Sequence, residues 1–361
     1  MTAKSSARID GQALLTAIWP DVPIGPSIIQ NHYSVLLEHF EDELQILRQN
    51  RDHIVLPATE DICKIIQLVK PIRTTTRQQM LQAIRLGLPC QENDDGKLQR
   101  SVDFAIRVWL TMGPGSLETG RQDLLPWQDG QTLQELAYSL FKLSHGSKSR
   151  EQSGSRIDPH LTAENLVSNY GYAINWTHNL ADHLAIDWKY KEITIYEHKI
   201  HLCNHLRFPE SAILPEDIAG EAIDTLNLLF PFQDDTTKRF LDKEKKLFYG
   251  LGFCNRPRNL DLDDYTFWRD RIEDLNYILR QPAVGLHQLR LDRGGNNMLQ
   301  ISAFWITVVL GLVTLISIAF AVGATVYGVK QYNISLKQYE LSVAEACLDP
   351  AAREKLKQFC S

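Results

Sequence analysis

Residues 301–329 read ISAFWITVVLGLVTLISIAFAVGATVYGV and contain no charged residue, histidine, asparagine, glutamine or proline. A helix of about 20 apolar residues is long enough to cross the hydrocarbon core of a bilayer. Trp305 and Tyr327 lie near the two ends, where aromatic rings favour the lipid headgroups. The alternative, a buried helix of a large soluble protein, rarely runs this far without a charge. The stretch therefore predicts one transmembrane helix, with Trp305 and Tyr327 as membrane anchors and the lipid bilayer as a partner.

The composition is that of a folded protein with an acidic body. The 361-residue chain is 44% hydrophobic and 23% charged, which is typical of globular proteins. The formal net charge is −6, and residues 330–361 carry five Lys or Arg against four Asp or Glu, so the preceding residues carry −7. An acidic body without a basic stripe argues against nucleic acid as a partner. We expect a protein partner instead.

The pattern along the chain predicts a mainly α protein with a small β-sheet (α+β), ending in one transmembrane helix. Helices are expected where apolar residues recur at helical spacing. Strands are expected where apolar residues alternate, as in YAINW and EITIY, and these two strands are candidates to pair. The predicted helices cover 27–50, 58–69, 73–88, 101–112, 133–143, 199–206, 215–230 and 264–279, and the predicted strands cover 172–176 and 192–196.

Changes in composition divide the chain into six parts. Proline and glycine gather at the end of the first part, which indicates a flexible lead-in. The segment SHGSKSREQSGS is typical of a polar linker or loop. The predicted parts are the lead-in (1–26), a helical subdomain (27–143), the polar linker or loop (144–160), an α+β subdomain (161–293), the transmembrane helix (301–329) and a short C-terminal tail (330–361).

The orientation in the membrane is predicted from the amino terminus. The first twenty residues lack the continuous apolar core of a signal peptide. Basic residues do not decide the orientation, because Arg290 and Arg293 precede the span while Lys330 and Lys337 follow it. We therefore expect a single-pass integral membrane protein whose body is cytosolic and whose tail is lumenal or extracellular.

The cysteines fit this orientation. Four of them are scattered through the body without CxxC spacing, which is expected of reduced thiols. These are Cys63, Cys90, Cys203 and Cys254. Cys347 and Cys360 lie in the tail, and outside the cytosol they would be able to close a disulfide loop around AAREKLKQF. The alternative is two free tail thiols.

Three histidines have the spacing of a metal site on a helix. His198, His201 and His205 fall at i, i+3 and i+7, which puts them on one helix face. The i, i+4 pair His201 and His205 is able to share a metal. No carboxylate or thiol is marked by spacing to complete the site, so a polar helix face is the favoured interpretation. We expect no metal and no other cofactor.

Two further histidines are the weak catalytic candidates. His178 and His183 flank Asp182 in NWTHNLADHL, and a histidine beside a carboxylate can act as a general base. However, no Ser or Cys lies in a nucleophile elbow such as GxSxG. The favoured interpretation is that both histidines are polar neighbours of a core.

Other motifs favour ordinary structural roles. The segment Asp261-Leu262-Asp263-Asp264 matches the DxDD acid of some cyclases, but it precedes a predicted helix, where Asp is a common cap. The glycosylation sequons at Asn175 and Asn333 are interpreted as chance matches. Phosphate-binding loops of the GxxxxGK[ST] or GxGxxG type are missing.

Small residues four apart occur within the predicted span. The pairs are Ser317/Ala321, Ala319/Gly323 and Ala324/Gly328. Such pairs allow close packing of helices in lipid, although Gly and Ala are also common in spans generally. Homo-oligomerisation through the transmembrane helix is therefore one hypothesis for this stretch.

Several segments of the second half are similar to a family of filamentous-fungal proteins that has no assigned activity. They are NWTHNLADHL, EITIYEHKIHL, LNLLFPF, FWRDRIEDL and FWITVVLGLVTLI, and the similarity extends over residues 72–330. The resemblance implies a helical cytosolic domain with a C-terminal single-pass anchor, and it supplies no catalytic residues. The anchor is also similar to that of two-helix magnesium channels, but this chain has one predicted span and no GMN signature.

Two functional hypotheses follow. The favoured one is a membrane-anchored interaction or scaffold protein without enzymatic activity, because a clear anchor is combined with no coherent catalytic constellation. The alternative is a membrane-tethered enzyme or accessory factor of fungal specialised metabolism, acting on an apolar substrate delivered from the bilayer. A deep apolar pocket around His178, Asp182 and His183 would favour the alternative, whereas histidines scattered on a convex surface would favour the first hypothesis.

Overall fold

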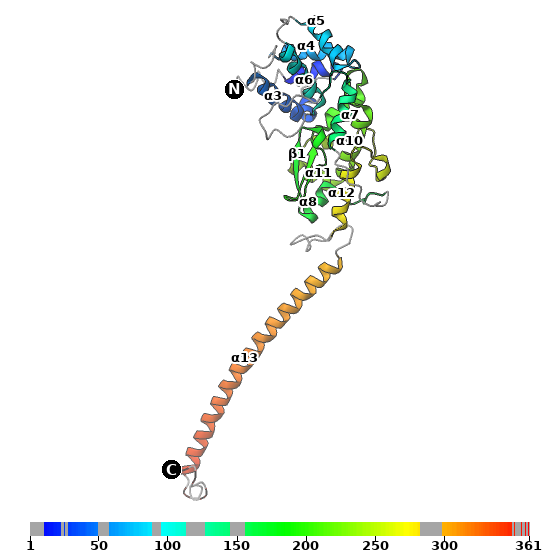
Figure 1. Cartoon of the computed structure of the whole chain (residues 1–361). Coiled ribbons are helices and arrows are strands. Elements are labelled where there is room, and N and C mark those ends of the chain that lie inside the picture. The colour runs from blue at the N-terminus through cyan, green and yellow to red at the C-terminus, as the bar shows by residue number, and fades with distance from the viewer. Residues whose placement is uncertain are drawn as a thin grey trace. The chain divides into compact units, whose positions relative to one another are not determined.

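The computed structural model describes residues 11–22, 25, 28–49, 58–88, 95–112, 127–144, 156–281 and 298–348, together with residues 350, 355, 358 and 360. The chain divides into two units, Met1–His287 and Gln288–Ser361 (Figure 1). The described residues are mostly helical and include one three-stranded sheet and one long apolar C-terminal helix, which confirms the predicted fold class.

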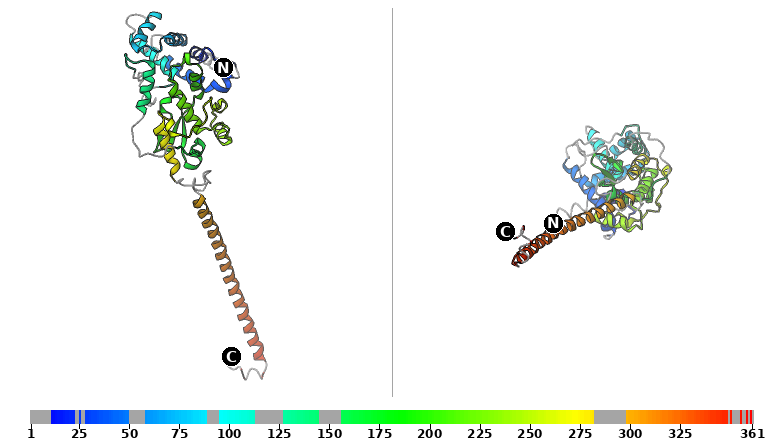
Figure 2. Two further views of the ribbon diagram at one scale, coloured as in Figure 1. Left: turned by 90° about the vertical axis from the view of Figure 1, so that its right-hand side faces the viewer. Right: turned by 90° about the horizontal axis from the view of Figure 1, so that it is seen from below.

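Helices make up the first half of the body. In Figure 2 they are the blue and cyan elements at one end of this unit, while the green sheet and the yellow α12 lie toward the other end. Arg77 of α5 forms a buried ion pair with Asp103 of α6, with 3.1 Å between Nη2 and Oδ2. The elements are a helix over 11–18, η1 (Ile29–Tyr33), α3 (Ser34–Gln49), α4 (Thr59–Val69), α5 (Arg77–Gly87), α6 (Asp95–Leu110) and α7 (Leu133–Ser144).

The predicted flexible lead-in is wrong for residues 11–22. Residues 11–18 form a helix, and the side chains of Leu14, Leu15, Ile18 and Trp19 are completely buried. Burying these large apolar groups stabilises the ordered segment enough to outweigh its loss of chain entropy. The prolines and glycines that follow indicate a flexible segment, but the apolar residues before them have helical spacing, and this spacing determines the structure of the segment. Residues 1–10 and most of the predicted linker, 145–155, lie outside the described residues, so the division at 144–160 stays a prediction.

The sheet joins the two strands that were expected to pair. Its order is β1 (Ala173–Thr177), β3 (Glu192–Tyr196), β2 (Ile186–Asp187). β1 and β3 are parallel, with Ala173 opposite Glu192 and Thr177 opposite Tyr196, which confirms the pairing. β2 adds to β3 in the antiparallel sense. Because β1 and β3 run in parallel, their carboxyl ends lie at the same edge of the sheet.

Helices complete the second half of the body. α10 lies deepest, and the four residues predicted to share one face, Ile218, Ala222, Leu226 and Leu229, are fully buried. The predicted helix over 264–279 instead begins at Arg269, because residues 262–264 form a short 3₁₀ helix that Asp261 caps. The elements are α8 (Ala163–Tyr170), α9 (Lys199–Arg207), α10 (Glu216–Leu229), α11 (Asp235–Lys243) and α12 (Arg269–Arg280).

The C-terminal unit contains the long helix α13 (Met298–Leu348). Its 51 residues extend about 76 Å at 1.5 Å per residue, more than twice the thickness of a bilayer core. No residue in the apolar window of α13 is buried, whereas the core helix of a soluble protein is mostly buried. The described residues thus include one candidate membrane-spanning helix, which supports a single-pass membrane protein. Trp305 and Tyr327 are 55% and 74% exposed.

The C-terminal tail combines a continuation of α13 with a disulfide. Residues 330–348 continue α13 without interruption. A disulfide then joins Cys347 to Cys360, with their Cα atoms 5.6 Å apart. Of the two alternatives for these cysteines, the structure has the closed loop.

Candidate functional site

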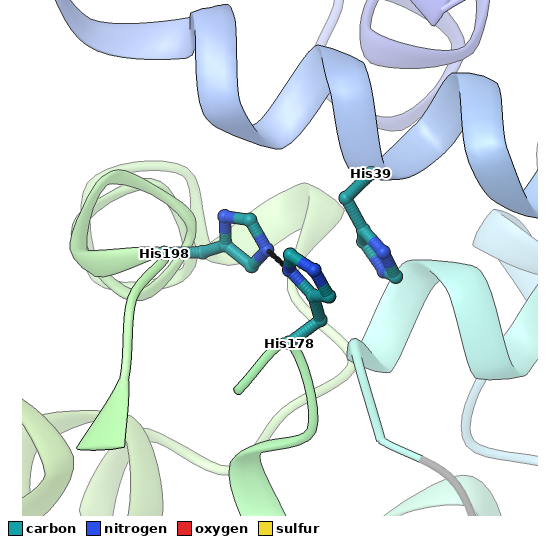
Figure 3. Close-up of side chains that lie close together, drawn as sticks. All are labelled: His39, His178 and His198. Carbon is teal, nitrogen blue, oxygen red and sulfur yellow. Dashed lines mark hydrogen bonds between the residues drawn. The ribbon is translucent and has the colours of Figure 1, made fainter. Parts of the chain in front are cut away.

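Three histidines from separate segments meet inside the body (Figure 3). His39 lies on α3, His178 follows directly after β1, and His198 is the N-cap residue of α9, two positions after β3. The parallel pairing of β1 with β3 brings His178 and His198 to the same edge of the sheet. The buried face of α3 supplies His39. Their candidate ligand nitrogens all lie within 4.8 Å of one another, so we call these three residues the histidine cluster.

The rings of the histidine cluster are nearly parallel. His178 Nδ1 lies 2.8 Å from His198 Nε2, and the two ring planes differ by 19°. His39 stacks on His178, with 4.6 Å between ring centroids and 11° between planes. A nitrogen–nitrogen contact of 2.8 Å is a hydrogen bond, so one of the two nitrogens carries a proton and the other accepts it.

A buried carboxylate determines which nitrogen carries that proton. Glu197 Oε1 lies 2.9 Å from His178 Nδ1, and Glu197 Oε2 is ion-paired with Lys246 Nζ. An ionised carboxylate only accepts hydrogen bonds, so His178 carries its proton on Nδ1, and this single N–H is shared between Glu197 Oε1 and His198 Nε2. Burial alone would raise the pKa of Glu197, but the hydrogen bonds from His178 and Lys246 outweigh burial and lower the pKa.

Burial holds the two inner histidines neutral. Removal from water lowers the pKa of His39 to about 3, and the same cause lowers the pKa of His198 well below its usual range. The neighbouring imidazoles act in the same direction. At neutral pH each of these rings therefore keeps one nitrogen lone pair. His178, by contrast, is 47% exposed at its side chain and is open to solvent.

A small cavity adjoins the histidine cluster. Its volume is about 20 Å³, and its polar lining includes His32, Glu197, His198 and Lys246. A cavity of this size holds about one water molecule. The remaining lining is mainly apolar and comes from α3, α9 and the residues around η8 (Phe248–Leu251). The cavity is thus suited to a small polar ligand beside His198.

The structure separates the three histidines that spacing placed on one helix face. His198 belongs to the histidine cluster, whereas His201 and His205 contact Trp19, with ring centroids 4.9 and 5.5 Å away. His198 has φ −89° and ψ 59°, which is not helical, so the helical periodicity does not include it. Both of the others are fully buried, so they do not form an exposed polar face.

The three catalytic candidates have different partners. His178 contacts Glu197 and His198, whereas Asp182 accepts a hydrogen bond from Asn179 Nδ2 at 2.9 Å. His183 is fully buried and hydrogen-bonds the Tyr196 amide and the Thr225 hydroxyl. The structure therefore does not join them through a common hydrogen-bond partner, and a catalytic role for them stays a prediction.

Sequence reasoning missed His39, Glu197 and Lys246. These residues join the site through contacts between segments distant in the chain, for which spacing gives no signal. Only His39 had a local signal in the sequence, because it lies on the same helical face as the buried residues Leu36 and Phe40 of α3. A histidine on an apolar face marks a buried polar group that needs a partner.

A disulfide between Cys203 of α9 and Cys254, beyond η8, was not expected. The two Cα atoms lie 6.4 Å apart. The expectation of separate reduced thiols is wrong for this pair in the structure, because spacing in the chain does not reveal contacts across 51 residues. Of the predicted sequons, Asn175 is exposed on β1 and Asn333 is exposed on α13; their use stays untested.

Comparison with known proteins adds no relative. No protein-family model matches the sequence, and neither a curated protein nor a solved structure matches it. The resemblance to a filamentous-fungal family stays a prediction. The functional argument therefore rests on the geometry of the body and on α13.

Proposed function

We propose that this protein is a single-pass, membrane-anchored interaction or scaffold protein that presents its folded body to a protein partner. The observation that carries the proposal is α13, because no residue in its apolar window is buried. Exposed apolar side chains on this scale are unfavourable in water and favourable in lipid. A bilayer is the environment that removes this cost.

Exposed aromatic residues on the body support a role in contact with a partner. Trp188 and Tyr190 are 47% and 69% exposed in the turn between β2 and β3. Asp187 Oδ1 fixes this turn by accepting hydrogen bonds from the backbone amides of Lys189 and Tyr190. Tyr and Trp are enriched among the residues that dominate binding at protein interfaces. A rigid turn that displays both is suited to bind a protein surface.

The proposed orientation has the body in the cytosol and the tail in the lumen or outside the cell. It is supported by the tail pair Cys347–Cys360, since disulfides persist in oxidising compartments. The structure also joins Cys203 to Cys254 by a disulfide, so this orientation requires that the reducing cytosol keeps the body pair reduced in the cell. Measuring the redox state of the two pairs therefore tests the orientation.

Self-association through the span is the second part of the proposal. Added Cβ atoms at Gly311, Gly323 and Gly328 would meet nothing within 4 Å in the chain. These positions are therefore open to close approach by a helix of a second copy. In a bilayer, replacing Gly323 and Gly328 with Leu should reduce energy transfer between differently labelled copies. Unchanged transfer would contradict self-association through these glycines.

The alternative function is a membrane-tethered enzyme or accessory factor of specialised metabolism. The observation that favours it is the half-exposed His178 held by Glu197 beside the small cavity. A histidine oriented by a carboxylate is able to act as a general base. The cavity accommodates a water-sized group, so a larger apolar substrate would require the site to open.

Proximity labelling of the full chain tests the favoured function. A biotin ligase is fused to the body, and labelled neighbours are compared between the wild type and Trp188→Ser/Tyr190→Ser. The variant should remain in the membrane but lose a defined subset of neighbours. Leu86→Ser is the matched control, because Leu86 is an apolar residue that is 91% exposed on α5, away from this turn in the sequence. This variant should keep the same subset of neighbours as the wild type. Identical labelling by wild type and the double variant would contradict binding through this turn.

A further inference from the structure

We propose that the histidine cluster, His39, His178 and His198, is a binding site for a divalent transition metal ion, with Zn²⁺ as the best-fitting candidate. Imidazole nitrogen is a preferred ligand of Zn²⁺, Cu²⁺ and Ni²⁺. Three protein ligands with a fourth position open are the usual composition of a zinc site that binds water or a substrate group. This set of residues differs from the helix triplet suggested by spacing.

The separations of the ligand atoms are compatible with closure around an ion. In a tetrahedral zinc site with Zn–N bonds of about 2.0–2.1 Å, the nitrogens lie about 3.3 Å apart. One nitrogen of each ring lies within 4.8 Å of one nitrogen of both other rings, so for these three nitrogens the widest separation must shorten by at most about 1.5 Å. Lone pairs lie in the ring planes, so the stacked rings must also turn about their Cβ–Cγ bonds to converge. The half-exposed His178 has room for that rotation.

Each histidine has a lone pair to offer. Glu197 holds the proton of His178 on Nδ1, which leaves Nε2 to bind the ion. His198 Nε2 now accepts the proton of His178, and an ion would replace that hydrogen bond. An imidazole in its neutral form has one ring nitrogen without a proton, and His39 would bind the ion through that nitrogen.

Glu197 supplies the outer support that metal-binding histidines usually have. A ligating histidine generally donates its other ring N–H to a carboxylate or carbonyl, which fixes the ring and increases the basicity of the ligand. Glu197 Oε1, 2.9 Å from His178 Nδ1, provides this contact. Lys246 holds the second oxygen of Glu197, which keeps the carboxylate in place.

The structure also has room for a fourth ligand and a path by which an ion can enter. The cavity of about 20 Å³ beside His198 has room for about one water molecule as the fourth ligand. His178 opens the cluster to solvent, so an ion does not have to pass through the apolar core. His201 and His205, by contrast, are enclosed with Trp19 and offer two imidazoles only.

Calorimetric titration of the full chain with ZnCl₂ tests this proposal. The protein is purified in detergent with a tag that contains no histidine and is first stripped with a chelator. Wild type should bind one Zn²⁺ per chain, and His178→Ala should weaken binding at least 100-fold. Glu197→Gln should weaken it 10- to 100-fold, as losses of outer-shell partners do. His160→Ala, which removes an exposed histidine outside the cluster, should bind like the wild type.

Wild-type protein without saturable Zn²⁺ binding would overturn the proposal, as would His178→Ala with wild-type affinity. X-ray absorption of Zn²⁺-loaded wild type gives a readout that does not depend on a variant folding. It should count three imidazole ligands and one further oxygen ligand. A spectrum with one or two imidazoles would overturn the three-histidine site.

Discussion

His183 is held neutral by a set of hydrogen bonds that leaves no choice of tautomer. The Tyr196 backbone N–H donates to His183 Nδ1 at 3.1 Å. The Thr225 hydroxyl donates to the Ala222 carbonyl at 2.7 Å, so its oxygen accepts from His183 Nε2 at 2.8 Å. A second proton would have to bind Nδ1, where it would face the Tyr196 N–H donor instead of an acceptor. Burial, assisted by the positive charge of Arg271, lowers the pKa of His183 to about 3.

This pKa predicts how one residue contributes to acid sensitivity. The pKa of His183 in the folded state lies below the unfolded value near 6.5, so the unfolded state binds the extra proton. The contribution to stability is fully present above about pH 6.5 and is lost as pH falls toward 3, by about 1.4 kcal/mol per pH unit. In urea unfolding of the full chain in detergent, His183→Gln should therefore show a shallower loss of stability between pH 6 and 4.

His160→Gln is the matched control for this measurement. It removes a histidine from an exposed turn and should keep the wild-type dependence on pH. Equal slopes for His183→Gln and the wild type would show that His183 is not held neutral in the fold.

At the scale of elements, α12 receives its N-terminal cap from another helix. Its own N-cap residue, Trp268, provides no side-chain hydrogen bond. Glu221 of α10 instead accepts hydrogen bonds from the backbone amides of Thr266, Phe267 and Trp268, at 2.7–2.8 Å. A carboxylate at a helix amino terminus satisfies unpaired N–H groups and interacts favourably with the helix dipole.

Removal of this carboxylate should destabilise the body. Glu221→Ala leaves the amides of Thr266, Phe267 and the N-cap residue Trp268, which lead into α12, without their acceptor and should lower the free energy of unfolding by about 2–4 kcal/mol. Glu210→Ala is the control, because Glu210 is 96% exposed at its side chain, and it should cost less than about 0.5 kcal/mol. Chemical unfolding followed by tryptophan fluorescence measures both. A loss below about 1 kcal/mol for Glu221→Ala would contradict the capping role.

Local signals predicted some elements well. The helix expected over 58–69 is α4, which ends just before Pro71, and the helix expected over 215–230 is α10. Their apolar periodicity and their prolines are properties of the local sequence. The two strands were predictable for the same reason, because alternation of apolar residues is a local property. Their parallel orientation was not predictable from the sequence.

Elements determined by distant contacts could not be predicted in this way. The start of α12 depends on Glu221, which lies 45 residues before the first amide it binds. The helix α11 was not predicted either, although its cap is local: Asp234 accepts hydrogen bonds from the amides of Thr236 and Thr237. The histidine cluster combines His39 of α3 with His178, which follows β1, and His198, which precedes α9, so spacing in the sequence does not identify it.

For the whole molecule, two cysteine pairs lie on opposite sides of residues 301–329 in the sequence. If this stretch crosses a membrane, Cys203–Cys254 and Cys347–Cys360 face different compartments. A reducing cytosol keeps thiols reduced, whereas secretory compartments allow disulfides to persist. The proposed orientation therefore predicts an oxidised tail pair and a reduced body pair in the cell.

Thiol labelling tests this prediction. Free thiols are blocked at lysis, disulfides are then reduced, and the released thiols are tagged with a maleimide that adds mass. The tail pair should be tagged, and Cys347→Ser/Cys360→Ser should abolish the shift. Tagging of the body pair alone would reverse the orientation. Tagging of both pairs would place both in one oxidising compartment and would contradict a membrane crossing between them.

The central claim is that α13 holds the chain in a lipid bilayer, and extraction of cell membranes with alkaline carbonate tests it most directly. The full chain should remain in the membrane pellet, because carbonate releases peripheral proteins but not a spanning helix. Leu312→Arg/Ile316→Arg introduces two charges in the middle of the span, at about 2.5–3.5 kcal/mol each, and should shift the protein to the supernatant. Release of the wild-type chain by carbonate would contradict the account.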